Sequence, residues 1–290
     1  MTATTFIDGL SLGAIYALIA LGYTMVYGIA KMLNFAHGDI IMVGAYTVYS
    51  TLLWMGKPIL AVIFAIAVCV ILGVVIEKVA YKPLRGASPL AVLITAIGVS
   101  YLLQAIAQLA FGAKAVPVGL PRFPVLHIGD KLVVNVSTLI TLGVGSVLMI
   151  ALTLFIKKSK IGRAMIAVSE DRKAAQLMGV NVNRIISLTF AIGSALAAVA
   201  SIFYLMQIPN TSPTLGSMPG IKAFTAAVIG GIGSIPGAMI GGVLLGVVEK
   251  ICLSIPALNP YTTAIEFAIL IVILMVRPTG ILGKKIREKV

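Results

Sequence analysis

Residues 31–39, KMLNFAHGD, form the most polar stretch beside the first two apolar runs of the sequence. Asn34, His37 and Asp39 flank apolar helices here, and polar groups at membrane depth are costly and often functional. These side chains could therefore line the path of a small solute. A cytoplasmic turn that caps the second helix, with Asp39 near the N-terminus of that helix, explains the same residues equally well, so both interpretations stay open.

Two carboxylates lie within or beside later apolar segments. Glu266 falls early in the last apolar run, and Glu249 stands next to Lys250 at the end of a glycine-rich run. A carboxylate inside a membrane span is a functional candidate. We nevertheless favour structural roles, in which Glu266 reaches water near the outer interface and Glu249 forms a solvated helix end with Lys250.

The sequence contains none of the usual enzymatic motifs. A phosphate-binding GxxxxGK[ST] loop, an HExxH motif and a nucleophile elbow are all absent. His37 and His127 lie about 90 residues apart, which makes a structural zinc site improbable. We therefore expect a protein that is not an enzyme and that holds no metal or cofactor of its own.

The charged segment of residues 157–184, called the docking segment below, interrupts an otherwise apolar chain. Ser169 is a natural N-cap, and Glu170 and Asp171 would then occupy a first turn that favours negative charge. Gly179 is placed to end the helix in the left-handed conformation. The sequence therefore predicts a short helix over Glu170–Met178.

A helix of that length needs support from another surface, because it is too short to be stable alone in water. Ala174, Leu177 and Met178 share one face at i, i+3, i+4 spacing. We interpret this apolar face as a docking element held on one side of a membrane.

Composition sets the fold class. The 290 residues are 60% hydrophobic and 11% charged, with a mean hydropathy of +1.10, which indicates an all-α polytopic bundle rather than a soluble protein or a barrel. Fifteen of the 22 Lys and Arg lie in three segments that the positive-inside rule assigns to the cytoplasm, and no aromatic residues alternate with them as nucleic-acid binding would require. Cys69 and Cys252 sit in apolar sequence and are expected to be buried free thiols.

We expect about eight membrane segments in a single domain of residues 1–290. Seven are ordinary spans near Phe6–Ala30, Ile40–Met55, Ile59–Ile76, Leu90–Gly112, Leu132–Ile156, Ile185–Ile208 and Tyr261–Val276. The eighth, Ala223–Val248, holds seven glycines and Pro236, which suits a broken or re-entrant helix. If the docking segment and the C-terminal tail lie on the same face of the membrane, the glycine-rich segment Ala223–Val248 must leave by the face that it enters or contain two crossings. The same rule places the N-terminus on the outer face.

Three motifs together resemble the branched-chain amino acid permease family of bacterial ABC importers, of the LivH type. They are LNFAHGDIIMVGAY, GRAMIAVSEDRKAAQLMGVN and GGIGSIPGAMIGG, in that order. The resemblance implies a multi-pass inner-membrane subunit that imports leucine, isoleucine and valine. It also implies a second related permease chain, two cytoplasmic ATPase subunits that bind the ATP, and a periplasmic solute-binding protein.

The resemblance further implies that the docking segment couples the permease to an ATPase. The usual EAAxxxG pattern reads here Lys173, Ala174, Ala175 and Gly179, with lysine in place of glutamate. The coupling residues implied are Gly162, Arg163, Glu170, Asp171, Ala174, Ala175, Leu177, Met178 and Gly179. The candidate path for the solute consists of Asn34, His37, Gly38, Gly230, Gly231 and Gly233.

Other functions remain open at this stage. Urea permeases of the same family look alike, so a urea or other amide permease is the nearest alternative. An ion-coupled secondary transporter is less favoured because acidic residues at mid-membrane depth are scarce. A passive channel would conduct without an ATPase, and a membrane-embedded enzyme is the least favoured reading.

Overall fold

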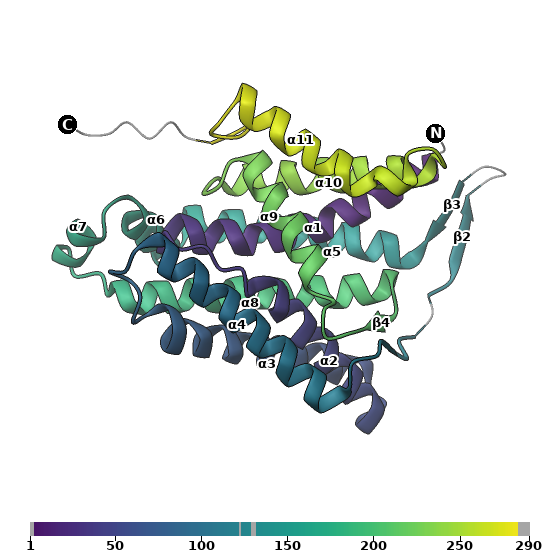
Figure 1. The fold of residues 1–290 in the computed structure, drawn as a ribbon, viewed down its shortest axis with the longest axis horizontal. Coiled ribbons are helices and arrows are strands. Elements are labelled where there is room, and N and C mark those ends of the chain that lie inside the picture. The colour runs from purple at the N-terminus through teal and green to yellow at the C-terminus, as the bar shows by residue number, and fades with distance from the viewer. Residues whose placement is uncertain (1–2, 122, 129–131, 284–290) are drawn as a thin grey trace.

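The computed structural model describes residues 3–121, 123–128 and 132–283, and these form a bundle of helices with two small pairs of antiparallel strands at one end (Figure 1). The helices in order are α1 Ala3–Ala30, α2 His37–Met55, α3 Pro58–Ile76 continued by the π-helical turn η1 Glu77–Tyr81, α4 Pro89–Phe111, α5 Val136–Lys158, α6 Lys160–Glu170, α7 Arg172–Leu177, α8 Val182–Gln207, α9 Ser217–Gly230, α10 Ile235–Ser254, the 3-10 turn η2 Asn259–Tyr261, and α11 Thr262–Val276. The all-α prediction is confirmed.

Four short strands lie at the end of the bundle opposite α6 and α7 (Figure 1). Strand β1 (Val116–Pro117) pairs antiparallel with β4 (Asn210–Thr211), and β2 (Val125–Ile128) pairs antiparallel with β3 (Leu132–Asn135). We call this end the strand end and the opposite one the docking end. The predicted span Leu132–Ile156 was wrong at its start, because residues 132–135 form β3 and the helix begins at Val136.

Seven helical stretches of the described residues are long and apolar enough to cross a membrane, namely α1, α3 with η1, α4, α5, α8, α10, and η2 with α11. The α2 helix has 19 residues but is less apolar, and it begins at His37, three residues before the predicted start of its span. With α2 added, and with α9 and α10 counted together as the broken glycine-rich segment, these helices make up the eight membrane segments expected.

Helix α1 is the centre of the bundle. Nearly all of its residues from Gly9 to Ala30 are buried. Its own apolar residues are distributed all around the helix and leave no polar face, as expected of a helix in the core. Its glycines allow α10 to approach closely: a Cβ on Gly13 would lie 2.7 Å from the Cα of Val243, and a Cβ on Gly246 would overlap Gly13. These close glycine contacts therefore serve helix packing.

The direction of α1 follows from contacts at its two ends. Near its start, Asp8 accepts a hydrogen bond of 3.2 Å from Thr138, just after β3. At its last residue, the carbonyl of Ala30 accepts a hydrogen bond from Arg172 of α7. The N-terminal end of α1 thus lies at the strand end, opposite the docking segment, in agreement with the predicted topology (Figure 1).

The glycine-rich segment is broken, as its composition predicted. Gly231 and Gly233 have φ of +106° and +91°, a backbone region that favours glycine, and Ser234 then accepts a hydrogen bond of 3.3 Å from the amide of Gly237 as the N-cap of α10. Helices α9 and α10 pack as an antiparallel pair through Gly230 and Gly237. At 14 residues, α9 is about 21 Å long, shorter than a hydrocarbon core of roughly 30 Å. Gly233, between α9 and α10, lies against Gly28 near the end of α1, and Gly246 of α10 lies against Gly13 near its start, so α10 leads the chain back toward the strand end, as the charge rule required.

Candidate functional site

The docking segment begins with a sharp corner between α5 and α6. Ser159 ends α5 and caps α6, since its hydroxyl oxygen accepts a hydrogen bond of 2.8 Å from the amide of Gly162. A Cβ on Gly162 would overlap the backbone of Ile156, so only glycine fits this corner. Gly162, predicted as a coupling residue, has a clear structural role in placing α6.

The predicted helix Glu170–Met178 was wrong at its N-terminus. The break between α6 and α7 falls at Asp171, whose Oδ1 accepts hydrogen bonds from the amides of Lys173 and Ala174 at 2.8 and 3.0 Å. Ser169 lies inside α6, where its hydroxyl donates to the Ile166 carbonyl at 2.7 Å. Helix α6 continues to Glu170 because its inner face buries Gly162, Met165 and Val168.

The predicted left-handed Gly179 is confirmed, and the helix ends at Leu177, one residue before the predicted Met178. Gly179 has φ +83°, and its amide donates to the carbonyl of Gln176 at 3.0 Å. The amide of Val180 donates to the carbonyl of Ala175, also at 3.0 Å. These two bonds form a Schellman motif, which holds α7 to six residues.

The large apolar side chains at the C-terminal end of α7, Leu177 and the capping residue Met178, are exposed. Leu177 is 89% exposed and Met178 is 84% exposed, and Ala174 is exposed as well. Ala175 is buried and attaches the helix to the bundle, whereas Arg163 and Glu170 are exposed on α6. A six-residue helix that presents two large apolar side chains is suited to contact with another protein.

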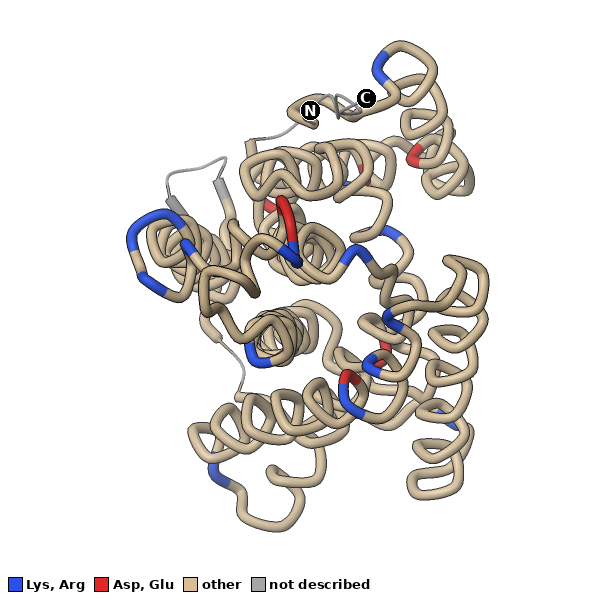
Figure 2. The backbone as a smooth tube through the Cα atoms, turned by 90° about the vertical axis from the view of Figure 1, so that its left-hand side faces the viewer, with Lys and Arg blue, Asp and Glu red and all other residues tan. Residues whose placement is uncertain are grey.

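The docking segment is also strongly basic. Seven Lys and Arg lie between residues 157 and 184, against the two acids Glu170 and Asp171. Figure 2 shows the molecule from this end, with Lys and Arg in blue and Asp and Glu in red. This end therefore carries an excess of positive charge.

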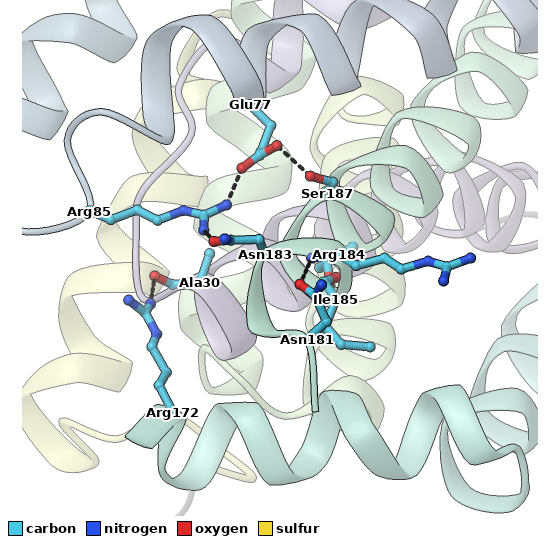
Figure 3. A network of polar contacts seen from close by, with 10 residues as sticks. Ala30, Glu77, Arg85, Arg172, Asn181, Asn183, Arg184, Ile185 and Ser187 are labelled. Atoms are coloured by element: carbon cyan, nitrogen blue, oxygen red, sulfur yellow. Dashed lines mark hydrogen bonds and ion pairs between the residues drawn. The ribbon is translucent and has the colours of Figure 1, made fainter. Parts of the chain in front are cut away.

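A polar network joins the turn after η1 to α8 (Figure 3). Arg85 forms an ion pair with Glu77 and a hydrogen bond with the Oδ1 of Asn183. The second oxygen of Glu77 accepts a hydrogen bond of 2.6 Å from Ser187 of α8. Glu77 is fully buried, so these contacts satisfy a carboxylate that would otherwise be costly at this depth.

Arg172 connects the docking helix to the core. Its guanidinium donates to the carbonyl of Ala30, one of the carbonyl groups that the C-terminus of α1 leaves without an intrahelical partner (Figure 3). Lys31 follows with φ +53°, unusual for a residue other than glycine, and the chain turns back into the bundle toward α2. The end of α1 is thus held directly by α7.

Positive charges crowd around this contact. Burial, and secondly the charge of Arg85, lower the pKa of Arg172. Burial, and secondly the charge of Arg172, lower the pKa of Lys31. Glu77, Arg85 and Arg172 were not among the candidate site residues predicted from the sequence. The sequence did offer one indication of this network, because Glu77 is the only acidic residue beside the cations of residues 78–85.

The first group of candidate path residues lies together inside the bundle. Asn34 accepts a hydrogen bond of 2.9 Å from Tyr81, the ring of His37 is 4.8 Å from that of Tyr23, and all these side chains are buried. Gly38 packs tightly against Gly216, so its lack of a side chain serves a close helix contact. The interpretation as a capping turn was wrong, because α2 begins after Ala36 with no side-chain cap and Asn34, His37 and Asp39 are all buried, although Asp39 does lie in the first turn of α2. The path stays a prediction.

The glycines assigned to the same path belong to a different contact region. Gly230 packs against Gly237 in the α9–α10 pair, and Gly231 packs beside Gly283. Gly233 lies next to Gly28, in the last turns of α1. These glycines shape the break between α9 and α10, and their role in a path is likewise only a prediction.

The two carboxylates near the last spans share a cation that the sequence analysis overlooked. Lys222 of α9 pairs with Glu249 at 2.7 Å and with Glu266 at 3.2 Å. Glu249 also accepts a hydrogen bond of 2.7 Å from Tyr16. The expectation that Glu266 reaches water was wrong, since its side chain is fully buried. We call Lys222, Glu249 and Glu266 the buried triad.

Comparison with known proteins gives a consistent result. Residues 5–274 match the model of the family described as branched-chain amino acid transport system / permease component. The high-affinity branched-chain amino acid transport system permease protein BraD of Pseudomonas aeruginosa is 46% identical, over 98% of this chain and 96% of its own length. LivH of Escherichia coli K12 is 45% identical over the same shares, and the probable LivH of Methanocaldococcus jannaschii is 30% identical over 92% and 88%.

Proposed function

Because this chain belongs to the branched-chain amino acid permease family, a family of multi-pass inner-membrane proteins, we propose that it is the permease subunit through which an ABC importer moves leucine, isoleucine and valine into the cell. ATP would be bound and hydrolysed by two separate cytoplasmic subunits. A second related permease and a periplasmic solute-binding protein would complete the importer.

The observation that supports this proposal most strongly is the construction of α7. It is a six-residue helix, capped at both ends by Asp171 and Gly179, and it presents Leu177 and Met178 to the solvent. Such a helix is rigid, basic in its surroundings and apolar at its tip. These are the properties required of a coupling helix that an ATPase subunit can bind and displace.

The contacts of the docking end suggest how this movement would reach the membrane spans. Displacing α7 moves Arg172, which holds the end of α1, the most buried helix of the bundle. The neighbouring network through Arg85, Glu77 and Ser187 joins the end of α3 to α8. The three helices would therefore shift together, and the closely packed glycine contacts along α1 would allow sliding between two discrete arrangements.

Charging the tip of α7 tests the proposal. The complete importer would be reconstituted in vesicles with Leu177→Glu, and leucine uptake and ATP hydrolysis would be measured together. Because Leu177 is 89% exposed, the variant should fold and insert normally. We expect loss of uptake and of the ATPase activity that the binding protein stimulates.

Leu177→Met is the matched control, since it keeps an apolar side chain at the same position, and it should retain both activities. Full coupling in Leu177→Glu would overturn the docking role of α7. Competition of labelled leucine with isoleucine, valine and urea then tests the substrate, and competition by urea alone would indicate an amide permease.

A further inference from the structure

A cavity of about 480 Å³ opens beside α7, between the turn that follows η1 and the start of α8. Three cationic side chains line it, from Arg85, Arg172 and Lys173. Three side-chain amides also line it, from Gln176, Asn181 and Asn183. No carboxylate occurs among the described residues that line the cavity, so its polar wall consists of cations and amide groups.

The positive charge of this cavity is not balanced by any acidic residue among the described residues of its wall. Arg85 is paired with Glu77, which does not line the cavity, yet the Nε of Arg85 is buried and has no hydrogen-bond partner in the described part of the chain. A buried donor of this kind normally finds an acceptor. Burial, and secondly the positive charge of Arg85, lower the pKa of Arg172. A lowered pKa is the direction expected for a cation that lies near another cation.

We propose that this cavity receives a carboxylate side chain of the ATPase subunit that docks on α7. The inference rests on the proposed function and adds the chemistry of its interface. Arginine and lysine bind carboxylates through short charge-assisted hydrogen bonds, and a planar guanidinium can do so with two parallel bonds. Insertion of one acid would bring a counter-charge to Arg172 and Lys173 at once.

The location favours a protein carboxylate over the phosphate of a lipid. The cavity shares α7 with the exposed pair Leu177 and Met178, so a protein that covers this apolar pair also meets the cavity. Helix α7 forms the extreme tip of the docking end, beyond the ends of the long helices (Figure 1). A partner subunit therefore reaches both features in a single contact.

Zero-length cross-linking of the complete importer tests the proposal. A carbodiimide activates a carboxylate as an O-acylisourea, and the Nζ of Lys173 then attacks the acyl carbon. An amide bond forms and the urea leaves, so a product arises only where amine and acid are in contact. We expect mass spectrometry to find Lys173 joined to an Asp or Glu of the ATPase subunit.

Lys173→Arg is the matched control, because it keeps the positive charge but cannot give this product. Lys173→Arg should also keep the ATPase bound, whereas Lys173→Glu should reduce the retained ATPase about tenfold at low salt, with a smaller difference at high salt. Cross-links confined to other lysines, or equal retention in both variants, would overturn the proposal.

Two outcomes separate this proposal from the proposed function. If the wild-type chain retains no ATPase subunit, the proposed function itself fails. If the wild-type chain retains the ATPase but Lys173→Glu lowers this retention only in vesicles that contain phosphatidylglycerol, the cavity binds a lipid headgroup and the carboxylate proposal is wrong.

Discussion

Two ionic networks among the described residues differ in composition and in surroundings. At the docking end, Arg85 and Arg172 lie beside Lys173 at an open cavity, and Glu77 supplies the carboxylate that pairs with Arg85. Among α1, α9, α10 and α11, the buried triad has the opposite balance, since two carboxylates share the ammonium of Lys222.

The difference separates contacts that hold the fold from contacts available for a partner. The triad makes its bonds within the chain, with Tyr16 as a further donor, and it joins four helices. The docking network ties α3 and α8 together but leaves cationic groups facing a cavity. Substitutions in the triad should therefore change stability, and substitutions at the docking end should change coupling.

Removing the shared cation is the strongest test of this comparison. Lys222→Met leaves two buried carboxylates without their counter-charge, which should lower the free energy of unfolding by about 3–5 kcal/mol. The measurement is unfolding of the purified protein in mixed micelles with increasing denaturing detergent. Lys250→Met changes a lysine next to Glu249 but outside the triad, and it should lower the free energy of unfolding much less. Equal losses in the two variants would refute the structural role of Lys222.

The two acids of the triad should not be equivalent. Glu249 lies closer to Lys222 and also accepts a bond from Tyr16, whereas the second oxygen of Glu266 has no hydrogen-bond partner among the described residues. Losing a hydrogen bond to a charged group costs about 1.5–3 kcal/mol, so Glu249→Gln should destabilise by roughly this amount.

Glu266→Gln should lower the free energy of unfolding by less than Glu249→Gln does, because it also removes one of two like charges that share a single cation. The same unfolding measurement in mixed micelles ranks the two variants. A larger loss in Glu266→Gln than in Glu249→Gln would contradict this description of the triad.

The triad also shows where sequence analysis reached its limit. Glu249 and Glu266 were recognised as unusual because a carboxylate in an apolar run is rare. Their partner Lys222 precedes Glu266 by 44 positions, and no local pattern indicates the pairing. Only the antiparallel packing of α9 on α10, with α11 beside them, brings the three charges together.

The helices themselves were largely predictable, because long apolar runs have few alternatives in a membrane and Gly179 marks a left-handed helix end. Family membership and the transport function were also recognised from three motifs, and the comparisons confirm both. The start of α7 was not predictable, since Ser169 and Asp171 are both good N-caps. The burial of Met165 and Val168, a tertiary effect, decided between them.

Arg172 provides a test at the docking end. Arg172→Gln should lower leucine uptake about tenfold, equivalent to about 1.4 kcal/mol, because α7 would no longer hold the carbonyl of Ala30. The amount of folded protein and ATPase binding should change far less than uptake. The number of ATP molecules hydrolysed per leucine transported should rise, a readout that simple destabilisation would not move.

Arg184→Gln is the control for charge at the same end, since Arg184 is exposed and its side chain points away from the network (Figure 3). It should leave the ratio of ATP to leucine unchanged. If both variants behave alike, the contact with Ala30 does not carry the coupling.

The smallest expected effect concerns the cap of α7. Asp171→Ala removes the acceptor for the amides of Lys173 and Ala174, at a cost of about 1 kcal/mol. Amide hydrogen exchange in α7 should therefore accelerate about fivefold, with a modest loss of uptake. Ser169→Ala should leave exchange in α7 unchanged, because its hydroxyl bonds within α6. Faster exchange in Ser169→Ala than in Asp171→Ala would instead support the helix start that the sequence alone predicted.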